Sequence, residues 1–563
     1  MIRSVFRHPD RQSPHYKWVA LSNTTLGMLL ASINATSLII ALPVIFRGIH
    51  INPLDSSSFT FLLWILLGYM LVTAVLVVTL GRLGDMYGRV KMYNLGFIVF
   101  TLGALSASLT WSTGSAGALE LIIFRMIQAI GGAMLMANSA AILTDAFPEN
   151  QRGMSLGINQ IAAIAGSFIG ILVGGFLAQF SWRWVFLFNV PIGVIGAVWS
   201  YIALKEIDRF RPAKIDWLGN ITFAAGLATL LTGITYGIRP YGNSAMGWDN
   251  PLVINLIFAG LILLVLFVII ERKVKDPMFN LHLFSIRAFT AGNVAGLLAA
   301  MGRGGLQFLL IMWLQGIWLP LHGYAFTQTP LWAGIYMLPE TAGFLVAGPL
   351  SGYLSDKYGA RPFATGGMLL AAASFGLMML LPIDFPYWAF AGILILNGLA
   401  FGMFSSPNTA GIMNSVPAEH RGVASGMRAT FMNVGMPLSI GVFFSLMIVG
   451  LTASVPGSIY QGLTSNGVST VVATHLSHLP AVSYLFAAFL GYNPLKTLLG
   501  PSVLGHLKPS AAAQLTSKEY FPQIIGQPFK HGLVIVLSFA IAACLVAAVA
   551  SWLRGGKYIN PES

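Results

Sequence analysis

Arg125, Arg303 and Glu340 are ionisable side chains that lie inside apolar runs long enough to cross a membrane. A charge at membrane depth is costly, so such a residue is by default a functional candidate. Burial favours the neutral form of a carboxyl group and a nearby cation favours its charged form, so Glu340 can gain and lose a proton. We hypothesise that Glu340 carries a transported proton and that Arg303 tunes it. The alternative, an ion pair with a purely structural role, is weighed evenly with it.

The positions of these residues make a direct contact feasible. Arg303 lies midway through the apolar run 288–319, and Glu340 lies midway through the run 330–353. Consecutive helices would hold the two side chains at comparable depth. Arg125 lies in the run 118–145, where we expect it to couple a proton or a substrate to a neighbouring acid.

Two short charged turns repeat along the chain. Residues 81–88 and 352–359 both read G-x-L-x-D-x-Y-G, and their aspartates lie 271 residues apart. A second pair, residues 148–153 and 417–422, repeats at an offset of 269. Two unrelated signatures at nearly one offset indicate an internal duplication, as in many secondary transporters.

The repeated turns are candidates for a conformational latch. Their glycines allow helices to approach closely, and their aspartates can accept hydrogen bonds from helix N-termini or arginines. Such a contact can hold one conformation and break in another; a static staple between helices is the alternative. The predicted latch residues are Gly81, Asp85, Gly88 and Arg89 in the first copy and Asp356 and Arg361 in the second.

The composition excludes a soluble protein. Hydrophobic residues make up 56% of the chain and charged residues 9%, whereas soluble domains carry about 25% charged residues. The single cysteine, Cys544, excludes a disulfide framework and a thiolate metal site, and no metal is expected. The net charge of +13 comes from short loops between apolar runs, which fits the positive-inside rule better than a nucleic-acid partner.

Fourteen apolar runs are candidates for membrane-spanning helices. An even number puts both ends of the chain on one side, and basic residues on alternate loops predict that this side is the cytoplasm. The runs are 18–46, 59–80, 93–111, 118–145, 154–180, 184–204, 216–238, 251–271, 288–319, 330–353, 362–381, 386–412, 423–452 and 531–553.

The repeat offset spans eight of the expected helices, two more than a six-helix bundle contains. We therefore predict an N-terminal six-helix bundle (1–204), two inserted helices with cytoplasmic linkers (205–280) and a C-terminal six-helix bundle (281–563). The last bundle contains an outer insertion, 453–530, whose seven prolines exclude one continuous helix. An interfacial segment, a cap over the outer mouth and a tolerated loop remain open for it.

The motifs resemble those of the major facilitator superfamily, in its fourteen-helix drug:proton antiporter branch. The repeated turns match its cytoplasmic motif, and Arg125 with Gln128 resembles its fourth-helix motif R-x-x-Q-G-x-G, although Ala129 replaces the first glycine. Residues 182–193 resemble the start of its sixth helix. The resemblance covers about residues 18–452 and the last helix. The glycines that resemble the fifth-helix antiporter motif are Gly166, Gly170 and Gly174.

The resemblance implies an all-α integral membrane protein with the major facilitator fold. It also implies proton-coupled efflux of amphipathic drugs by alternating access, driven by the proton gradient without a cofactor. The fifth-helix glycines would let helices pack closely and would bear on the exchange between inward- and outward-facing states; plain packing is the alternative reading.

Two departures from the branch concern this reading. Asn34 stands where the branch has an acid in its first helix, and Ile171 replaces a proline, which puts the expected kink of the fifth helix in doubt. The repeat offset places Arg303 opposite Asn34 in the other bundle. The missing acid weakens the case for cationic drugs, and Arg303 in the cavity would favour an anionic cargo.

Aromatic and amide side chains on the expected cavity-facing helices suit a large amphipathic ligand. Each of them alone can equally pack in the interior or face lipid. The candidate cavity residues are Asn34, Gln128, Gln307, Trp313, Gln315, Trp332, Tyr336 and Asn397.

These observations predict a multi-pass transporter of the cytoplasmic membrane. No nucleophile–base set or phosphate-binding loop indicates an enzyme. A small-molecule substrate, membrane lipid and a monomeric state are expected. One rival is an exporter of a specific endogenous lipid, siderophore or metabolite, and another is a membrane binding protein that transports nothing. Coupling to protons or to sodium is left open.

Overall fold

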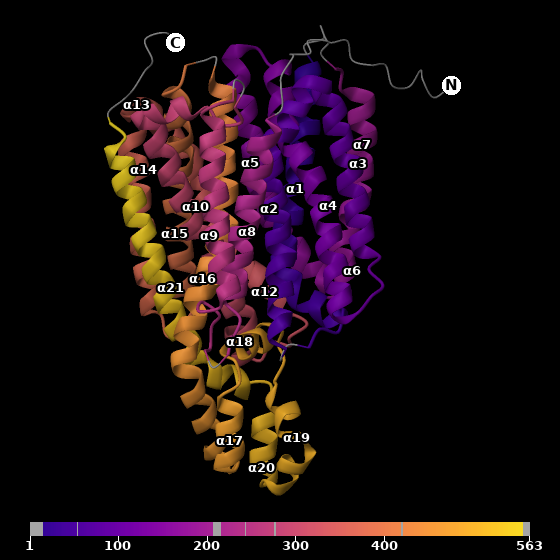
Figure 1. Ribbon diagram of the computed structural model, residues 1–563, viewed down its shortest axis with the longest axis vertical. Helices are drawn as coiled ribbons and strands as arrows, with labels where there is room; N and C mark the ends of the chain where they lie inside the picture. The colour runs from indigo at the N-terminus through magenta and orange to yellow at the C-terminus, as the bar shows by residue number, and fades with distance from the viewer. Residues whose placement is uncertain are drawn as a thin grey trace. The chain divides into compact units, whose positions relative to one another are not determined.

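A computed structural model describes residues 15–52, 55–206, 216–242, 244–274, 277–417 and 420–555. The two ends of the chain, which we expect in the cytoplasm, lie outside the described residues, as does the charged linker 207–215. Almost all of the described chain is helical (Figure 1). By its internal contacts it forms two compact units.

Unit 1 contains most of the first six expected helices. It comprises residues 1–50, 64–225 and 263–279, and its described part is built on α1 and α3, which pack against α5 and α4 respectively. An aromatic core of Tyr93, Phe97 and Phe100 lies between α3 and its neighbours. The helices are α1 (Tyr16–Gly48), α2 (Ser56–Tyr87), α3 (Arg89–Ser108), α4 (Gly114–Ala146), α5 (Glu149–Ala178), α6 (Trp182–Leu187) and α7 (Asn189–Ala203).

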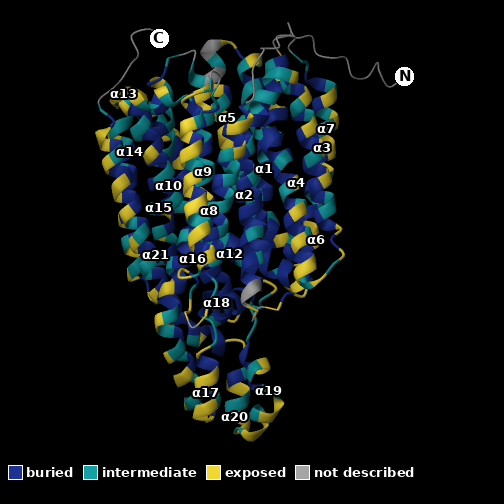
Figure 2. Cartoon of the chain, in the orientation of Figure 1, coloured by how far each residue is buried: buried dark blue, intermediate teal, exposed yellow. Residues whose placement is uncertain are grey.

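Unit 2 comprises residues 51–63, 226–262 and 280–563. The start of α2, the second half of α8 (Trp217–Gly237) and the first half of α9 (Pro251–Glu271) therefore group with unit 2, and the rest of these helices with unit 1. Along α9 most apolar side chains are exposed, a surface that suits lipid (Figure 2). The main helices of unit 2 are α10 (Arg287–Trp313), α12 (Thr329–Tyr336), α13 (Leu338–Tyr358), α14 (Ala360–Leu380), α15 (Tyr387–Asn414), α16 (Arg421–Ser465) and α21 (Tyr520–Leu553).

Thirteen helices of the described chain are long and apolar enough to cross a membrane, or fourteen if the bent pair α17 and α18 counts as one span. The expected single run 330–353 differs, because it is broken at Met337 into α12 and α13. Pro339 has no N–H to donate to the carbonyl of Ile335, so a hydrogen bond of the helix is lost at this point, which favours the break. Glu340 consequently lies in the first turn of α13 and not midway through a helix.

The helices that flank the outer insertion are longer than the sequence predicts. Their expected ends at 452 and 531 are wrong, because α16 continues through Pro456 to Ser465 and α21 already begins at Tyr520. The two extensions support each other: the Tyr520 hydroxyl donates to the Gly462 carbonyl at 2.7 Å. Between them lie four short helices, seen at the bottom of Figure 1: α17 (Thr470–Ser477), α18 (Ala481–Phe489), α19 (Leu495–His506) and α20 (Pro509–Thr516).

One of these helices, α18, is buried along its whole length (Figure 2). Its Phe486 ring lies 6.1 Å from that of Phe59, and its Phe489 ring lies 5.5 Å from that of Phe308. All four residues belong to unit 2. The insertion therefore supplies an apolar helix to the interior of unit 2, which fits neither a loose loop nor a helix lying on a surface.

Candidate functional site

The structure contains the ion pair that the sequence makes feasible in unit 2. The Nε and Nη2 atoms of Arg303 on α10 each lie 3.3 Å from Oε1 of Glu340 on α13. Glu340 is only 3% exposed, whereas about a quarter of the Arg303 side chain is exposed. The guanidinium also lies over the rings of Phe344 and Phe401, at 4.8 and 5.7 Å from their centroids. A proton gained by Glu340 would therefore remove the charge that holds Arg303 here.

Unit 1 holds a second polar cluster, which we call the Arg125 cluster: Arg125, Asn34, Gln128 and Tyr69. Arg125 is 1% exposed, and its Nη1 donates to Asn34 Oδ1 at 2.9 Å and to Gln128 Oε1 at 2.8 Å. Its guanidinium lies 4.2 Å from the centroid of the Tyr69 ring.

The expected acidic neighbour of Arg125 is absent from the described chain. No ion pair is formed by Arg125 there, and its side chain bonds to the two amides instead. Glu120, the nearest acid along α4, lies near the start of that helix and accepts a hydrogen bond from the hydroxyl of Ser112. The prediction of a neighbouring acid is therefore wrong, because α1 supplies Asn34 at the position that could have held one.

The two clusters are related by the internal repeat. The offset of 271 residues takes Glu340 to Tyr69, and the offset of 269 takes Arg303 to Asn34. Unit 2 thus pairs a cation on α10 with an acid on α13. On the corresponding helices of unit 1, α1 and α2, these positions hold an amide and a phenol. Unit 1 adds its own cation from α4, so the charge of the Arg125 cluster is uncompensated.

The predicted cavity residues of unit 2 fall into two groups. Trp313 is 1% exposed and packs in an aromatic core, with its ring centroid 4.9 Å from that of Phe385. Asn397 is held by a 2.8 Å hydrogen bond to Ser374 Oγ. These two side chains are fixed by packing and hydrogen bonding within unit 2.

The remaining cavity candidates lie on α10, on the turn that continues its C-terminal end and on α12. Gln315 is buried in a π-helical turn (Leu314–Trp318) that continues α10. Gln307 lies earlier, within α10, and is partly buried. Trp332 and Tyr336 on α12 are partly exposed, with ring centroids 5.7 Å apart. The Tyr336 hydroxyl shares a 2.8 Å hydrogen bond with that of Tyr324. This group is aromatic and sparsely polar, and its role in binding an amphipathic molecule stays a prediction.

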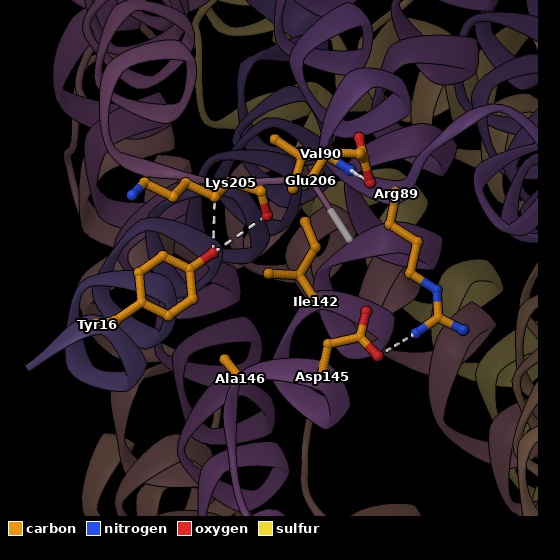
Figure 3. Close-up of a pocket in the computed structure, with 8 residues that line it drawn as sticks. All are labelled: Tyr16, Arg89, Val90, Ile142, Asp145, Ala146, Lys205 and Glu206. Carbon is orange, nitrogen blue, oxygen red and sulfur yellow. Dashed lines mark hydrogen bonds and ion pairs between the residues drawn. The ribbon is translucent and has the colours of Figure 1, made fainter. Parts of the chain in front are cut away.

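The first predicted latch is formed in unit 1. Arg89 lies 2.7 Å from Asp85, at the end of α2. It also lies 2.7 Å from Asp145, at the end of α4 (Figure 3). Gly88 between α2 and α3 has a φ of 114°, which disfavours any residue with a side chain. Arg89 thus joins the ends of two helices, and the sequence did not indicate Asp145 because its pairing depends on the packing of α4.

Glu206, a residue that sequence reasoning missed, caps α3 beside this latch (Figure 3). Its carboxylate accepts hydrogen bonds from the backbone N–H groups of Val90 at 3.3 Å and Lys91 at 2.9 Å. A carboxylate at a helix N-terminus is stabilising because it meets unpaired amides and the positive end of the helix dipole. The segment that leaves α7 is thereby attached to the latch.

Glu206→Ala should lower the free energy of unfolding by about 1 kcal/mol, because the α3 amides lose their acceptor. The measurement is the midpoint of thermal unfolding of the purified protein. Glu519→Ala is the matched control, since Glu519 also precedes a helix, α21, but makes no capping hydrogen bond there. Equal shifts in the two variants would contradict the capping role.

The second copy of the motif in unit 2 is built differently. Gly359 again has a positive φ, 85°, but the Arg361 guanidinium lies over the Trp552 ring of α21, 3.8 Å from its centroid. The repeat offset takes Asp145 to Asn414, so the acid that receives Arg89 in unit 1 has no counterpart there. The two predicted latches therefore differ: the arginine of the first pairs with two carboxylates, and the arginine of the second lies over an aromatic ring.

The three predicted packing glycines form a seam between α5 and α1 in unit 1. A Cβ at Gly166 would lie 2.8 Å from the carbonyl oxygen of Leu29, and one at Gly170 or Gly174 would lie 2.5 Å from that of Ile33 or Ser37. No side chain fits in such spaces without movement of α1. With Ile171 in place of proline, α5 is one continuous helix.

Two further buried carboxylates were not predicted. Asp216, at the start of α8, is 5% exposed and Glu271, at the end of α9, is 3% exposed. Asp216 Oδ2 and Glu271 Oε1 both face Gly219, and neither oxygen has a hydrogen-bond donor in the described structure. The sequence did offer a signal for them, because Asp216 is the first residue of the predicted run 216–238 and Glu271 is the last residue of the next run, 251–271.

Comparisons with known proteins agree on one family. Residues 24–216 and 214–440 match the model of the Major Facilitator Superfamily. The chain is 28% identical to the riboflavin transporter RibZ of Clostridioides difficile, over 84% of this chain and 96% of that protein. It is 26% identical to the multidrug transporter protein MdtP of Bacillus subtilis, with 92% and 91% covered. It is 30% identical to the methyl viologen resistance protein SmvA of Salmonella typhimurium, with 78% and 84% covered.

Solved structures share the fold. A bacterial homologue of the human lysosomal transporter Spinster, in an inward-facing and occupied conformation, aligns with a TM-score of 0.55 at 16% identity, over 96% of this chain and 97% of that one. A D-xylose-proton symporter aligns with a TM-score of 0.54 at 15% identity, over 84% and 97%.

Proposed function

This chain belongs to the Major Facilitator Superfamily, and on that premise we propose that it exports amphipathic small molecules across the cytoplasmic membrane in exchange for protons. It is a multi-pass membrane transporter and not an enzyme. The relatives named for multidrug transport and for resistance to tetracenomycin C and methyl viologen support the efflux direction.

The observation that carries the proton coupling is the Arg303–Glu340 pair. Of the three buried carboxylates in the described chain, Glu340 alone lies within the helices of unit 2 and contacts a cation there. In the proposed cycle, ionised Glu340 holds Arg303 in one conformation. Protonation neutralises Glu340 and releases Arg303, which allows unit 2 to rearrange with the proton bound.

Alternating access requires contacts that form in one state and break in another. The proposed latch is Arg89 with Asp85 and Asp145, which joins the ends of α2 and α4. The glycine seam between α1 and α5 gives these helices a tight and smooth contact along which they can shift. In this proposal the latch and both chain ends face the cytoplasm, and the transporter acts as a monomer; the support for its orientation is the distribution of Lys and Arg among the loops.

The proposal is tested with purified protein in liposomes under an imposed pH gradient. Rhodamine 6G, a cation, and fluorescein, an anion, share one xanthene ring system and separate the effect of charge from that of shape. Transport that collapses with the pH gradient, and is unchanged by a sodium gradient, is the expected result. Transport of both dyes without dependence on pH would overturn proton coupling.

The riboflavin transporter among the relatives favours a second candidate, a transporter of one specific metabolite. For that candidate, neither dye would be transported, and unlabelled riboflavin is the first compound to test. Counterflow distinguishes both candidates from a protein that only binds its ligand, because exchange of labelled for unlabelled compound requires passage through the membrane.

A further inference from the structure

We infer that the Arg125 cluster binds an anionic group of the transported molecule, an inference that rests on the proposed export function. The unsatisfied groups of the cluster carry this assignment. Arg125 Nε and Gln128 Nε2 are both buried and have no hydrogen-bond acceptor in the described structure, whereas the Asn34 amide also faces the Tyr69 hydroxyl. Both unsatisfied groups are N–H donors, so the group that would satisfy them is an acceptor.

The hydrogen bonds within the cluster explain why only donors are left. The side-chain oxygens of Asn34 and Gln128 are both turned to Nη1 of Arg125, at 2.9 and 2.8 Å. This arrangement leaves both amide NH₂ groups directed elsewhere. Both amides contact one nitrogen of Arg125, so the side chains of Asn34 and Gln128 lie together at the guanidinium in unit 1.

The charge of the cluster selects an anion over a neutral acceptor. Arg125 is 1% exposed and, in the described chain, has no acid within ion-pair distance. A buried cation without an anionic partner is strongly destabilising. A carboxylate would supply the missing charge, and its two oxygens match the planar guanidinium.

Tyr69 adds a restriction on the shape of the bound molecule. Its ring covers the Arg125 guanidinium at 4.2 Å, which leaves the guanidinium edge, where Nε lies, for a ligand. An anion bound in the plane of the guanidinium can carry an aromatic body beside the Tyr69 ring. The inferred cargo is therefore an amphipathic aromatic anion.

Asn34 determines this preference. An aspartate at position 34 would lie on Arg125 Nη1 in place of the amide oxygen and would neutralise the guanidinium. The cluster would then have no net charge for an anion to compensate. Asn34→Asp is almost isosteric, so it changes the charge of the cluster without changing its packing.

The experiment measures binding of fluorescein and rhodamine 6G to the purified full-length protein by fluorescence anisotropy, without any gradient. We expect the wild type to bind fluorescein more tightly. Arg125→Gln and Asn34→Asp should each weaken fluorescein binding by about 10- to 100-fold, the value of hydrogen bonds to a charged group. Asn34→Asp should also strengthen rhodamine 6G binding. Ser22→Asp, which adds a carboxylate at an exposed position of the same helix, should change neither.

Several results would overturn the inference: no fluorescein binding by the wild type, tighter binding of rhodamine 6G than of fluorescein, or fluorescein binding that Asn34→Asp leaves unchanged. Thermal unfolding confirms that each variant is folded, and Asn34→Asp decides the matter if Arg125→Gln does not fold. The binding inference and the proposed transport function can be overturned independently of each other. Fluorescein binding that depends on Arg125, without pH-driven transport, would keep this inference and overturn the proposed function; pH-driven transport of rhodamine 6G alone would do the reverse.

Discussion

Glu340→Gln is expected to abolish pH-driven transport while leaving the protein folded. Glutamine keeps the size of the side chain and can still accept a hydrogen bond from Arg303, but it cannot bind and release a proton. Transport by the variant should no longer respond to the imposed pH gradient, whereas exchange of labelled for unlabelled dye without a gradient should continue. The measurement is uptake into liposomes with and without the gradient.

Glu120→Gln is the matched control for this variant. Glu120 accepts hydrogen bonds from Ser112 at the end of α4 and has no cation partner in the described structure, so its replacement should leave gradient-driven transport unchanged. A purely structural ion pair gives a different pattern for Glu340→Gln: a lower unfolding midpoint with transport that still follows the pH gradient. That pattern would remove Glu340 from the proton pathway.

Alanine at Gly170 and at Gly157 should have opposite effects on stability, although both glycines lie in α5. At Gly170 the new methyl group would lie 2.5 Å from the Ile33 carbonyl and still closer to Thr36 Oγ1, so α1 must move. We expect a loss of about 1–3 kcal/mol, typical of overpacking. Gly157 is exposed and has no atom within 4 Å of the new methyl group, so alanine there should add about 0.5–1 kcal/mol of helix stability.

The same pair of variants tests the role of the seam in transport. Movement of α1 would displace Asn34, one residue from the Ile33 contact, and with it the Arg125 cluster. Gly170→Ala should therefore reduce transport of a dye by the folded protein, and Gly157→Ala should not. Equal transport by both variants would show that the seam serves packing alone.

Local patterns predicted the fold well because hydropathy and repeated turns report directly on membrane-spanning helices. The Arg303–Glu340 contact could also be predicted from the sequence, since both residues lie at similar depth on consecutive runs. The break at Met337 was not, because a run of apolar residues looks continuous even where Pro339 removes a backbone donor.

Contacts between helices that are distant in sequence were the least predictable. Asp145 and Glu206 act on Arg89 and α3 only because the ends of α4 and α7 are packed beside them. The partners of Arg125 were mistaken for the same reason: the sequence indicates a buried cation on α4 but not which side chain α1 presents to it. The full lengths of α16 and α21 were missed because prolines at 456 and 528 were read as helix ends.

The length of α16 has a practical consequence for experiments on sidedness. Its 45 residues correspond to about 68 Å of helix, whereas the hydrocarbon core of a bilayer is about 30 Å thick. A large part of α16 must therefore lie outside the hydrocarbon core whatever state the transporter occupies. An epitope tag between α19 and α20 would be recognised by an antibody from one face of the membrane only, and would give the orientation of every molecule in a vesicle without reference to its activity.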